Sequence, residues 1–250
     1  MRRWLILLGC ILLLVQPVLA QEPLVALRIR VELVASEPDV DWDAAQGVIE
    51  QRVNGLGLLN YTVEQGDNRL IITTEAMMEF DEALSLSQRL IDVLGPITLL
   101  EFVDVQSSPI NRMLEGSCVQ TTGQLERGIV SDDCQLQPSG EPFLTVISGD
   151  DLETVEANLV DGRWQINFEI ADDASEVFAA FTQSHIGSSL AIVLDGQVLS
   201  VPIINARIDG FGVIAGDFTE EETKTLAIQL QSGSLPVGLE VQSVLIHRSQ

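Results

Sequence analysis

Apolar and polar residues alternate regularly through the first hundred positions of this chain. Apolar side chains occupy every second position over 24–33 with charged ones between them, which predicts a half-buried strand. Apolar residues at intervals of three and four, each set preceded by an aspartate, predict two capped helices. A Gly-Asp-Asn turn at 66–68 predicts a hairpin. The expected elements are strand 24–33, helix 43–54 after Asp41, strands 61–64 and 70–74, helix 81–94 capped by Asp81, and strand 97–105.

This β-α-β-β-α-β order is typical of the ferredoxin-like arrangement, in which both helices cover one face of the sheet. A polar segment over 106–142 follows and is predicted to be a linker or excursion, after which the patterns of a second α+β unit begin. Asp195-Gly196 predicts a two-residue hairpin, and Thr219 to Glu222 form a capping box. The expected elements here are strand 143–147, helix 151–159 capped by Ser148 or Asp150, strand 164–170, a helix capped by Asp172 and ended by Gly187, strands 190–194 and 198–204, the helix after Thr219, and strand 239–246.

The N-terminus has the pattern of an export signal. Two arginines precede an apolar stretch over 4–15, and small residues at 18–20 resemble a cleavage site before Gln21. We therefore expect residues 1–20 to be a secretory signal peptide. Two alternatives remain open, an uncleaved N-terminal membrane anchor and a lipoprotein cleavage site at Cys10. In each of these cases the rest of the chain is expected to be extracytoplasmic.

The charge of the chain excludes one class of partner. Lys and Arg number 13 against 37 Asp and Glu, which gives a net charge of −24. The first 20 residues contain two arginines and no acid, so their removal makes the protein more negative still. Such a surface repels phosphate backbones and anionic lipid head groups, and nucleic-acid binding is therefore not expected. Solubility outside the cell is the simplest reason for the acidity.

Two cysteines follow the N-terminal segment. Cys118 and Cys134 are an even pair in a chain predicted to be exported, so we expect them to form a disulfide. The segment between them is polar and contains glycine, and a bridge would stabilise it by roughly 3 kcal/mol on the chain-entropy model. Two cysteines without a nearby histidine do not make a tetrahedral metal site.

Several separate runs of sequence resemble the large extracytoplasmic domain of the SecD family, an accessory subunit of the bacterial protein-export channel. The runs appear in the family's order and span most of the chain after residue 20. A single hairpin or capping box is weak evidence, whereas this ordered set is specific. The runs are RVNGLG at 52–57, GDNRL at 66–70, LLEF at 99–102, AIVLDG at 191–196 followed by Ser200, Pro202 and Ile204, FTEE at 218–221, and Leu226-Ala227, Gly233, Leu235-Pro236 and Leu239-Glu240.

The resemblance implies a ferredoxin-like base formed by residues 21–105 and 236–250, with a SecD-like head subdomain inserted at 106–235. In the family the base lies near the membrane, and the head is thought to swing and hold an emerging preprotein. The sequence lacks the family's further membrane helices and its D-L-x-G-G element, so proton-driven work is not expected of this chain alone. Motif positions expected to be structural are Arg52, Asn54, Gly57, Asp195, Gly196, Pro202, Thr219, Glu222, Gly233 and Pro236.

Candidate catalytic groups are few. His185 and His247 are the only histidines, and His185 is expected at a helix end, where a structural role is favoured. Acidic pairs such as Asp150-Asp151 lie where helix caps or solvated loops are expected. No phosphate loop, dinucleotide fingerprint or nucleophile elbow is present in the sequence. We therefore expect a non-enzymatic protein that needs no cofactor and no metal, with an unrecognised hydrolase as an unfavoured alternative.

Binding is the remaining class of function. Phe211 lies between two glycines in a predicted turn and is followed by Val213 and Ile214. These three residues either fill the core or contact an extended apolar peptide. The leading hypothesis is that the protein binds unfolded or exported polypeptide or docks on Sec translocon subunits. The alternative is a structural or interaction module of the cell envelope that kept the fold without an export role.

Overall fold

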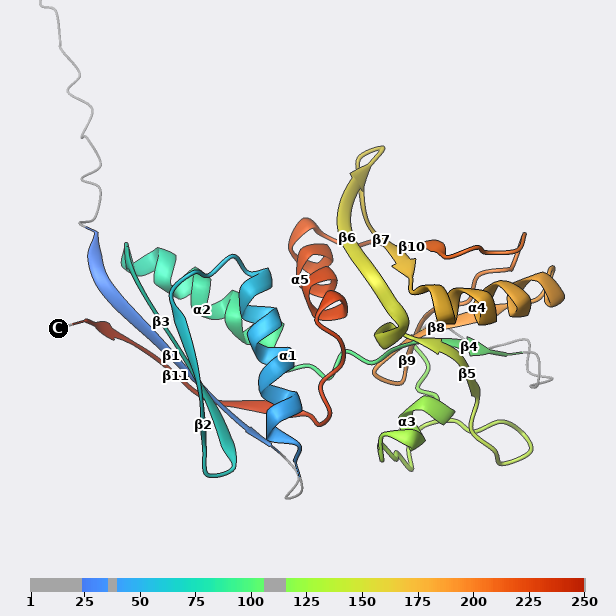
Figure 1. Ribbon diagram of the computed structural model, residues 1–250, viewed down its shortest axis with the longest axis horizontal. Coiled ribbons are helices and arrows are strands. Elements are labelled where there is room, and N and C mark those ends of the chain that lie inside the picture. Colours follow the sequence, from blue (N-terminus) through green and yellow to red (C-terminus); the bar gives the residue numbers. More distant parts are fainter. Residues whose placement is uncertain (1–23, 36–39, 106–115, 250) are drawn as a thin grey trace, which may run out of the picture.

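The computed structural model describes residues 24–35, 40–105 and 116–249 and has the mixed α+β class that the sequence predicts (Figure 1). The expected export signal at 1–20 with Cys10, and residues 106–115 of the expected linker, lie outside the described residues. Within the described part, no helix is long and apolar enough to cross a membrane.

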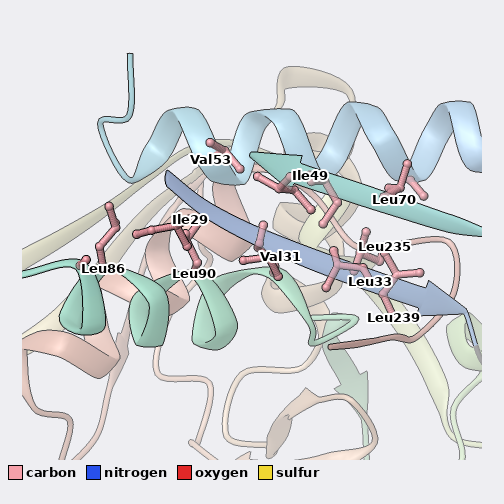
Figure 2. Packing of buried hydrophobic residues seen from close by; sticks show 14 of the residues in the cluster. Ile29, Val31, Leu33, Ile49, Val53, Leu70, Leu86, Leu90, Leu235 and Leu239 are labelled. Carbon is pink, nitrogen blue, oxygen red and sulfur yellow. The ribbon is translucent and has the colours of Figure 1, made fainter. Parts of the chain in front are cut away.

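The first sheet has the strand order β11-β1-β3-β2, and all its neighbouring strands are antiparallel. Helices α1 and α2 pack on one face, where apolar residues of β1 such as Ile29 and Leu33 meet Ile49 of α1 and Leu90 of α2 (Figure 2). The pattern of alternate apolar positions in the sequence produces this single buried face. The elements are β1 (Val25–Ala35), α1 (Trp42–Gly55), β2 (Tyr61–Gly66), β3 (Arg69–Met78), α2 (Phe80–Leu94) and β11 (Leu239–Arg248).

The strand expected at 97–105 does not join this sheet. Residues Leu100–Asp104 form β4, which pairs with β5 and β8 in a second sheet of order β5-β4-β8-β9. The C-terminal strand β11 takes the fourth place in the first sheet instead. Every residue of β4 from Leu100 to Val103 is buried, because both faces of its sheet are covered.

A third sheet of order β10-β7-β6 packs against the second across a shared core (Figure 1). Phe102 of β4, Phe168 of β7 and Phe178 of α4 form the aromatic centre of this core, with ring centroids 5.4 Å apart for both contacts of Phe102. Helix α5 packs on β6 and also contacts α1 and α2, so it lies between the two halves of the molecule. The elements are α3 (Thr122–Glu126), β5 (Leu144–Ser148), a 3-10 turn (Gly149–Asp151), β6 (Leu152–Val160), β7 (Arg163–Ile170), α4 (Asp172–Ser184), β8 (Leu190–Leu194), β9 (Gln197–Ser200), β10 (Phe211–Ala215) and α5 (Glu220–Gln231).

Several local predictions are wrong. The helix expected at 151–159 is strand β6, because the Ser148–Asp151 capping box closes only one 3-10 turn before the chain pairs with β7. The two aspartates expected as caps of α2 and α4 lie inside those helices, since the N-cap positions are Glu79 and Ala171. The strand expected at 198–204 ends at Ser200.

Candidate functional site

The exposed apolar residues singled out by the sequence lie on β10. Phe211 is 68% exposed and Val213 is 50% exposed, whereas Ile214 is only 2% exposed and belongs to the core. Phe211 therefore begins a strand and does not lie in a turn, and Ile214 is excluded as a contact for a partner. Alternation along the strand places Phe211 and Val213 together on the face that points away from the core.

Two glycines allow β10 to pack directly against the aromatic ring of Phe168 in the core. Gly210 has a φ of +91°, a conformation that other residues rarely adopt. Gly212 lies directly over the ring of Phe168, and a Cβ at this position would collide with that ring. The Gly-Phe-Gly pattern thus holds the strand against Phe168 while Phe211 points outward.

The two edges of the third sheet differ. At the β6 edge, the side chain of Gln231 accepts a hydrogen bond from the Val155 amide (2.7 Å) and donates one to the Glu153 carbonyl (3.1 Å). This amide side chain therefore occupies the place that another strand would take. At the other edge β10 is the last strand, and no further strand of the described chain pairs with it.

The alternation of hydrogen-bonded pairs between β10 and β7 shows which backbone groups of β10 point outward. The amide of Ile170 donates to the carbonyl of Gly210 at 2.7 Å, and the register continues without a bulge to Ala215. Because antiparallel pairs alternate, Gly212 and Ile214 bond to β7, while the amides and carbonyls of Phe211, Val213 and Ala215 point away from β7. These outward groups are the acceptors and donors that an added strand would need.

A cleft of about 850 Å³ borders this edge. Its walls are the C-terminal half of β10, the tip of the β6–β7 hairpin, and Leu199 and Ser200 of β9. Trp164 lines the cleft, and the ammonium of Lys224 lies 5.4 Å from the centre of its ring. The cleft thus combines an aromatic wall with the open strand edge, a combination suited to an extended peptide.

Arg52 is fully buried and joins the two halves of the molecule. Its guanidinium donates to the carbonyls of Val93 (3.0 Å), Pro96 (2.6 Å) and Ile97 (3.2 Å), and lies 3.5 Å from the carbonyl of Gly233. These carbonyls belong to the end of α2 and to both segments of chain that connect the first sheet to the rest. The last carbonyls of a helix lack intrahelical partners, and α2 has no basic residue in its last turn.

The charge of Arg52 is weakly compensated. Burial lowers its pKa to about 10, and the carboxylate of Asp195 opposes this shift at a distance. Among the described residues, the Nε atom of Arg52 has no hydrogen-bond partner. Asp195, whose pKa is raised by burial, accepts from the amide of Leu99 at 2.8 Å and so fixes the same connection.

Glu101 is a second buried charge that the sequence did not point to. Its carboxylate accepts from the hydroxyls of Thr121 and Thr145 (both 2.7 Å), and burial raises its pKa. Each hydroxyl, having given its proton to Glu101, accepts from a backbone amide of α3, that of Gln124 or of Gly123. Glu101 therefore fixes the orientation of both groups that cap α3.

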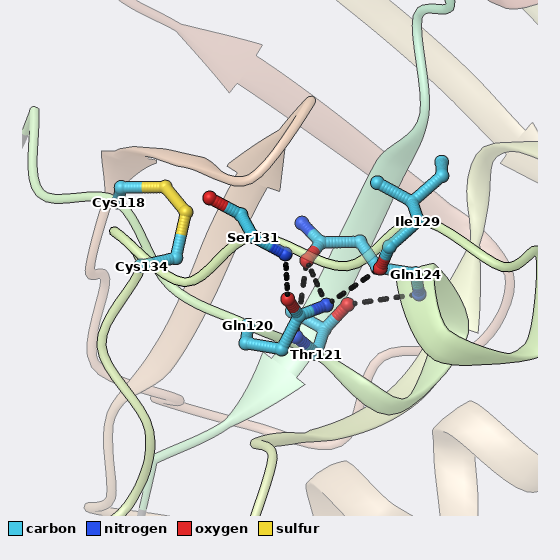
Figure 3. The surroundings of a disulfide bond; sticks show 7 residues. All are labelled: Cys118, Gln120, Thr121, Gln124, Ile129, Ser131 and Cys134. Atoms are coloured by element: carbon cyan, nitrogen blue, oxygen red, sulfur yellow. Dashed lines mark hydrogen bonds between the residues drawn. A yellow bond between two sulfur atoms is a disulfide. The ribbon is translucent and has the colours of Figure 1, made fainter.

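Cys118 and Cys134 lie together in a disulfide, as the sequence predicts (Figure 3). Gln120 supports the same loop, since its side chain donates to the Ile129 carbonyl (2.9 Å) and accepts from the Ser131 amide (2.9 Å). Backbone hydrogen bonds connect the Cys118 segment to β9. The loop is thus attached to the second sheet and is not a free linker.

The other motif residues have structural positions. Asn54 accepts a hydrogen bond from the Tyr61 hydroxyl at 2.9 Å. Thr219 and Glu222 form the complete capping box of α5, and these bonds to Thr219 lower the pKa of Glu222. The turn and helix-end residues with positive φ are Gly57, Asp195, Gly196 and Gly233. Pro202 and Pro236 lie in connections, one after β9 and one before β11.

The candidate catalytic residues lie on different elements and do not meet in one site. His185 forms the C-cap of α4 and stacks on Phe181 with 4.1 Å between ring centroids, while His247 lies on β11 beside Arg28. Asp150 accepts hydrogen bonds from the amide and the hydroxyl of Ser234, so it stabilises the connection between α5 and β11. No group of three potential metal ligands occurs among the described residues.

Comparison with known proteins gives consistent matches over most of the chain. Residues 139–237 match the family model for the P1 head subdomain of SecDF. The SecDF protein translocase subunit of Thermus thermophilus is 31% identical over 229 residues, which cover 87% of this chain and 30% of that protein. The SecD subunit of Aquifex aeolicus is 31% identical over 202 residues, covering 77% and 37% of the two chains. This chain therefore spans about a third of the length of these two relatives.

Two solved structures share the fold. A crystal structure of SecDF in a super-membrane-facing form matches with a TM-score of 0.66 and 28% identity, over 92% of this chain and 32% of that one. A second structure, from work on a membrane component SecDF that enhances protein export, has a TM-score of 0.59 and 28% identity and covers 86% of this chain and 98% of that one. The two matches cover both halves of the described structure.

Proposed function

Because the chain belongs to the SecD family of protein translocase subunits, we propose that it assists protein export by binding extended segments of exported or unfolded polypeptide at the open edge of β10. The observation that carries this proposal is the contrast between the two edges of one sheet. Gln231 covers the edge of β6 at Glu153 and Val155, while no strand of the described chain pairs with the outer edge of β10, where Phe211 and Val213 are exposed.

If an extended peptide is added to the sheet as a strand beside β10, its binding does not depend on one particular sequence. Main-chain groups of Phe211, Val213 and Ala215 supply hydrogen bonds that any extended peptide can complete. The exposed side chains add apolar contact on one face, and Trp164 in the adjoining cleft adds an aromatic surface. We expect weak binding, with Kd on the order of 10–100 µM, because only three residues of the edge take part.

The proposal assigns the domains as follows. Residues 106–235, together with β4, form the head that carries the site, and the first sheet with α1 and α2 forms the base. The head works outside the cytoplasm, without catalysis or a bound cofactor, and docks with its cargo on Sec translocon subunits. Gln229 of α5 joins the two parts, since its side chain donates to the Asp92 carbonyl at the end of α2 (2.9 Å), and Arg52 of α1 holds the two connections between them through the carbonyls of Ile97 and Gly233.

The test is fluorescence anisotropy of a labelled, reduced and unfolded secretory protein titrated with the purified chain. Val213→Pro removes one outward amide without removing a hydrogen bond to β7, and should weaken binding at least 5-fold. Phe211→Ser should have a smaller effect of the same sign. Leu59→Ser is the matched control, because Leu59 is 95% exposed but lies in the connection between α1 and β2.

Each outcome decides between the hypotheses. Absence of binding by the wild type up to high micromolar concentration would refute the binding function and favour the alternative of an envelope interaction module. Binding that both β10 variants leave unchanged would place the polypeptide elsewhere on the molecule. Emission from Trp164, in a background with Trp4→Phe and Trp42→Phe, gives an independent signal from the cleft.

A further inference from the structure

We propose that the cleft beside β10 holds one aromatic side chain of the bound segment, an inference that rests on the proposed function and specifies its ligand. A strand added beside β10 presents alternate side chains to the two faces of the sheet. On the outer face they meet Phe211 and Val213, which are exposed. A side chain opposite Ile214 points to the core face instead, because cross-strand neighbours share a face and Ile214 is buried in the core.

The cleft lies on this same core face. Ile214 pairs with Ile166 of β7, and Trp164 comes two residues before Ile166, so the three side chains share one face of the third sheet. Ile214 and Trp164 both line the cleft, and Leu199 lines it from β9 in the second sheet. The cleft therefore opens between the two sheets, on the side toward which the residue opposite Ile214 points.

The walls of the cleft favour an aromatic side chain. Trp164 is half-buried, yet within the described chain its ring belongs to none of the three clusters of packed apolar residues, whereas Trp42 packs against the first of them. Phe218 forms another wall, with its ring so close to Gly216 that a Cβ at this glycine would collide with it. Aromatic rings gain from stacked or edge-to-face contact beyond the burial of their surface. A volume of about 850 Å³ leaves room for such a ring.

The charged residues of the cleft do not select a charged ligand. Asp161, Asp217 and Arg163 are all exposed, and their opposite signs oppose each other for any ion that enters. A carboxylate does, however, accept a hydrogen bond from a phenol hydroxyl or from an indole N–H. Tyrosine and tryptophan therefore suit the cleft at least as well as phenylalanine, because each combines a ring with one polar group.

The aromatic residue also sets the register of the bound segment. Main-chain hydrogen bonds are equivalent in registers that differ by two residues, so they do not choose among them. A ring in the cleft should raise the affinity about 2- to 10-fold over leucine at the same position, through its contact with Trp164. Serine leaves the cleft unfilled and should bind about 10- to 100-fold more weakly than tyrosine.

Three uncharged, fluorescently labelled peptides of equal length test this inference, with Tyr, Leu or Ser as the single variable residue at the centre. Each is titrated against the purified full chain by anisotropy at about 20 mM and about 300 mM NaCl, which span weak and strong screening. We expect the order Tyr, Leu, Ser in affinity at both salt concentrations, because the contact is not ionic. Trp164→Leu should abolish the preference for Tyr over Leu, and Trp164→Phe, which keeps a ring, should retain most of it.

Ser200→Phe tests the space itself. Ser200 lines the cleft, and its partner Ile192 belongs to the core between the two sheets, so a ring at this position points into the cleft. The substitution should lower the affinity for the Tyr peptide to that for the Ser peptide. Trp42→Leu is the matched control, because Trp42 is a half-buried tryptophan on α1, and it should leave all three affinities unchanged. Urea melts of each variant establish that it is folded.

The outcomes separate this inference from the proposed function. Equal affinity for the three peptides would overturn the aromatic anchor and leave strand addition intact. A preference for Tyr that survives either Trp164→Leu or Ser200→Phe would place the ring elsewhere and would equally overturn it. If none of the peptides binds, or if Val213→Pro leaves the binding of all three unchanged, the proposed function itself fails.

Discussion

Replacement of Arg52 by alanine should destabilise the protein strongly although Arg52 contacts no ligand. The guanidinium makes its three shortest hydrogen bonds to the carbonyls of Pro96, Val93 and Ile97, at 2.6, 3.0 and 3.2 Å. Hydrogen bonds that involve a charged group contribute about 1.5–3 kcal/mol each, so the three together contribute roughly 4.5–9 kcal/mol. Alanine at this position removes all of them.

Burial of the charge offsets part of this gain. Burial lowers the pKa of Arg52 to about 10, a shift that corresponds to a cost of roughly 3 kcal/mol for keeping the guanidinium charged in the fold. The difference leaves a net contribution of about 1.5–6 kcal/mol, which spans the losses observed when one partner of a buried polar network is removed. We therefore expect Arg52→Ala to lower the free energy of unfolding by about 3 kcal/mol.

The assay is urea denaturation followed by circular dichroism, with Arg89→Ala as the control. Arg89 is an exposed arginine on α2, and its replacement should change the stability by less than about 0.5 kcal/mol. Arg52→Lys should fall between the wild type and Arg52→Ala, because one ammonium cannot reach the carbonyls that a planar guanidinium spans. A loss of less than about 1 kcal/mol in Arg52→Ala would refute the view that this side chain holds the end of α2 to both connections.

Three further predictions concern the part of the molecule outside the first sheet. Intact-mass analysis of the exported protein after alkylation without reductant should show no label on Cys118 or Cys134, and two labelled thiols would contradict the disulfide. Thr219→Ala should cost about 1 kcal/mol in urea melts through loss of the α5 cap, and superimposed melts would show that the cap contributes nothing. The folded-state pKa of Glu101 is raised, so its favourable contribution is present at acidic pH and is lost as the pH rises through that pKa. The stability of Glu101→Gln relative to wild type, followed by urea melts from acidic to neutral pH, should therefore improve as the pH rises, and a pH-independent difference would contradict the assignment.

Local signals in the sequence predicted much of the fold correctly. The alternation over 24–33 corresponds to β1, and the Thr219–Glu222 box forms as expected. The Asp195-Gly196 turn has positive φ at both residues, as a two-residue hairpin requires. In each case the cause lies within a few residues of chain, so the pattern contains the whole explanation.

Predictions failed where contacts with other elements of the fold decide the outcome. The residues after Ser148 carry a helix-start signal, yet they form β6 because β7 and α5 bury their apolar face. Strand β4 resembles the last strand of the first unit, but its neighbours are β5 and β8. Local propensity is a weak preference in both segments, and tertiary packing overrides it.

The candidate site was only partly visible in the sequence. The Gly-Phe-Gly pattern at 210–212 drew attention to Phe211, but the sequence alone left core filling and exposure open. Nothing near Gln231 in the sequence indicates that its amide covers the edge of β6 at Glu153 and Val155, or that no strand of the described chain pairs with the outer edge of β10. Trp164 and Lys224 likewise meet only because α5 packs beside the β6–β7 hairpin.

The sequence by itself determined the class of fold, the Asp195-Gly196 turn, the caps of α1 and α5, the acidic composition and the relationship to SecD. These properties depend on composition and on short-range spacing, which are the same in any arrangement of the elements. The tertiary structure alone decided which strand closes the first sheet, which carbonyls Arg52 holds and which sheet edge stays open. Those outcomes depend on contacts between residues far apart in the chain, whose geometry is set only when the two halves pack against each other.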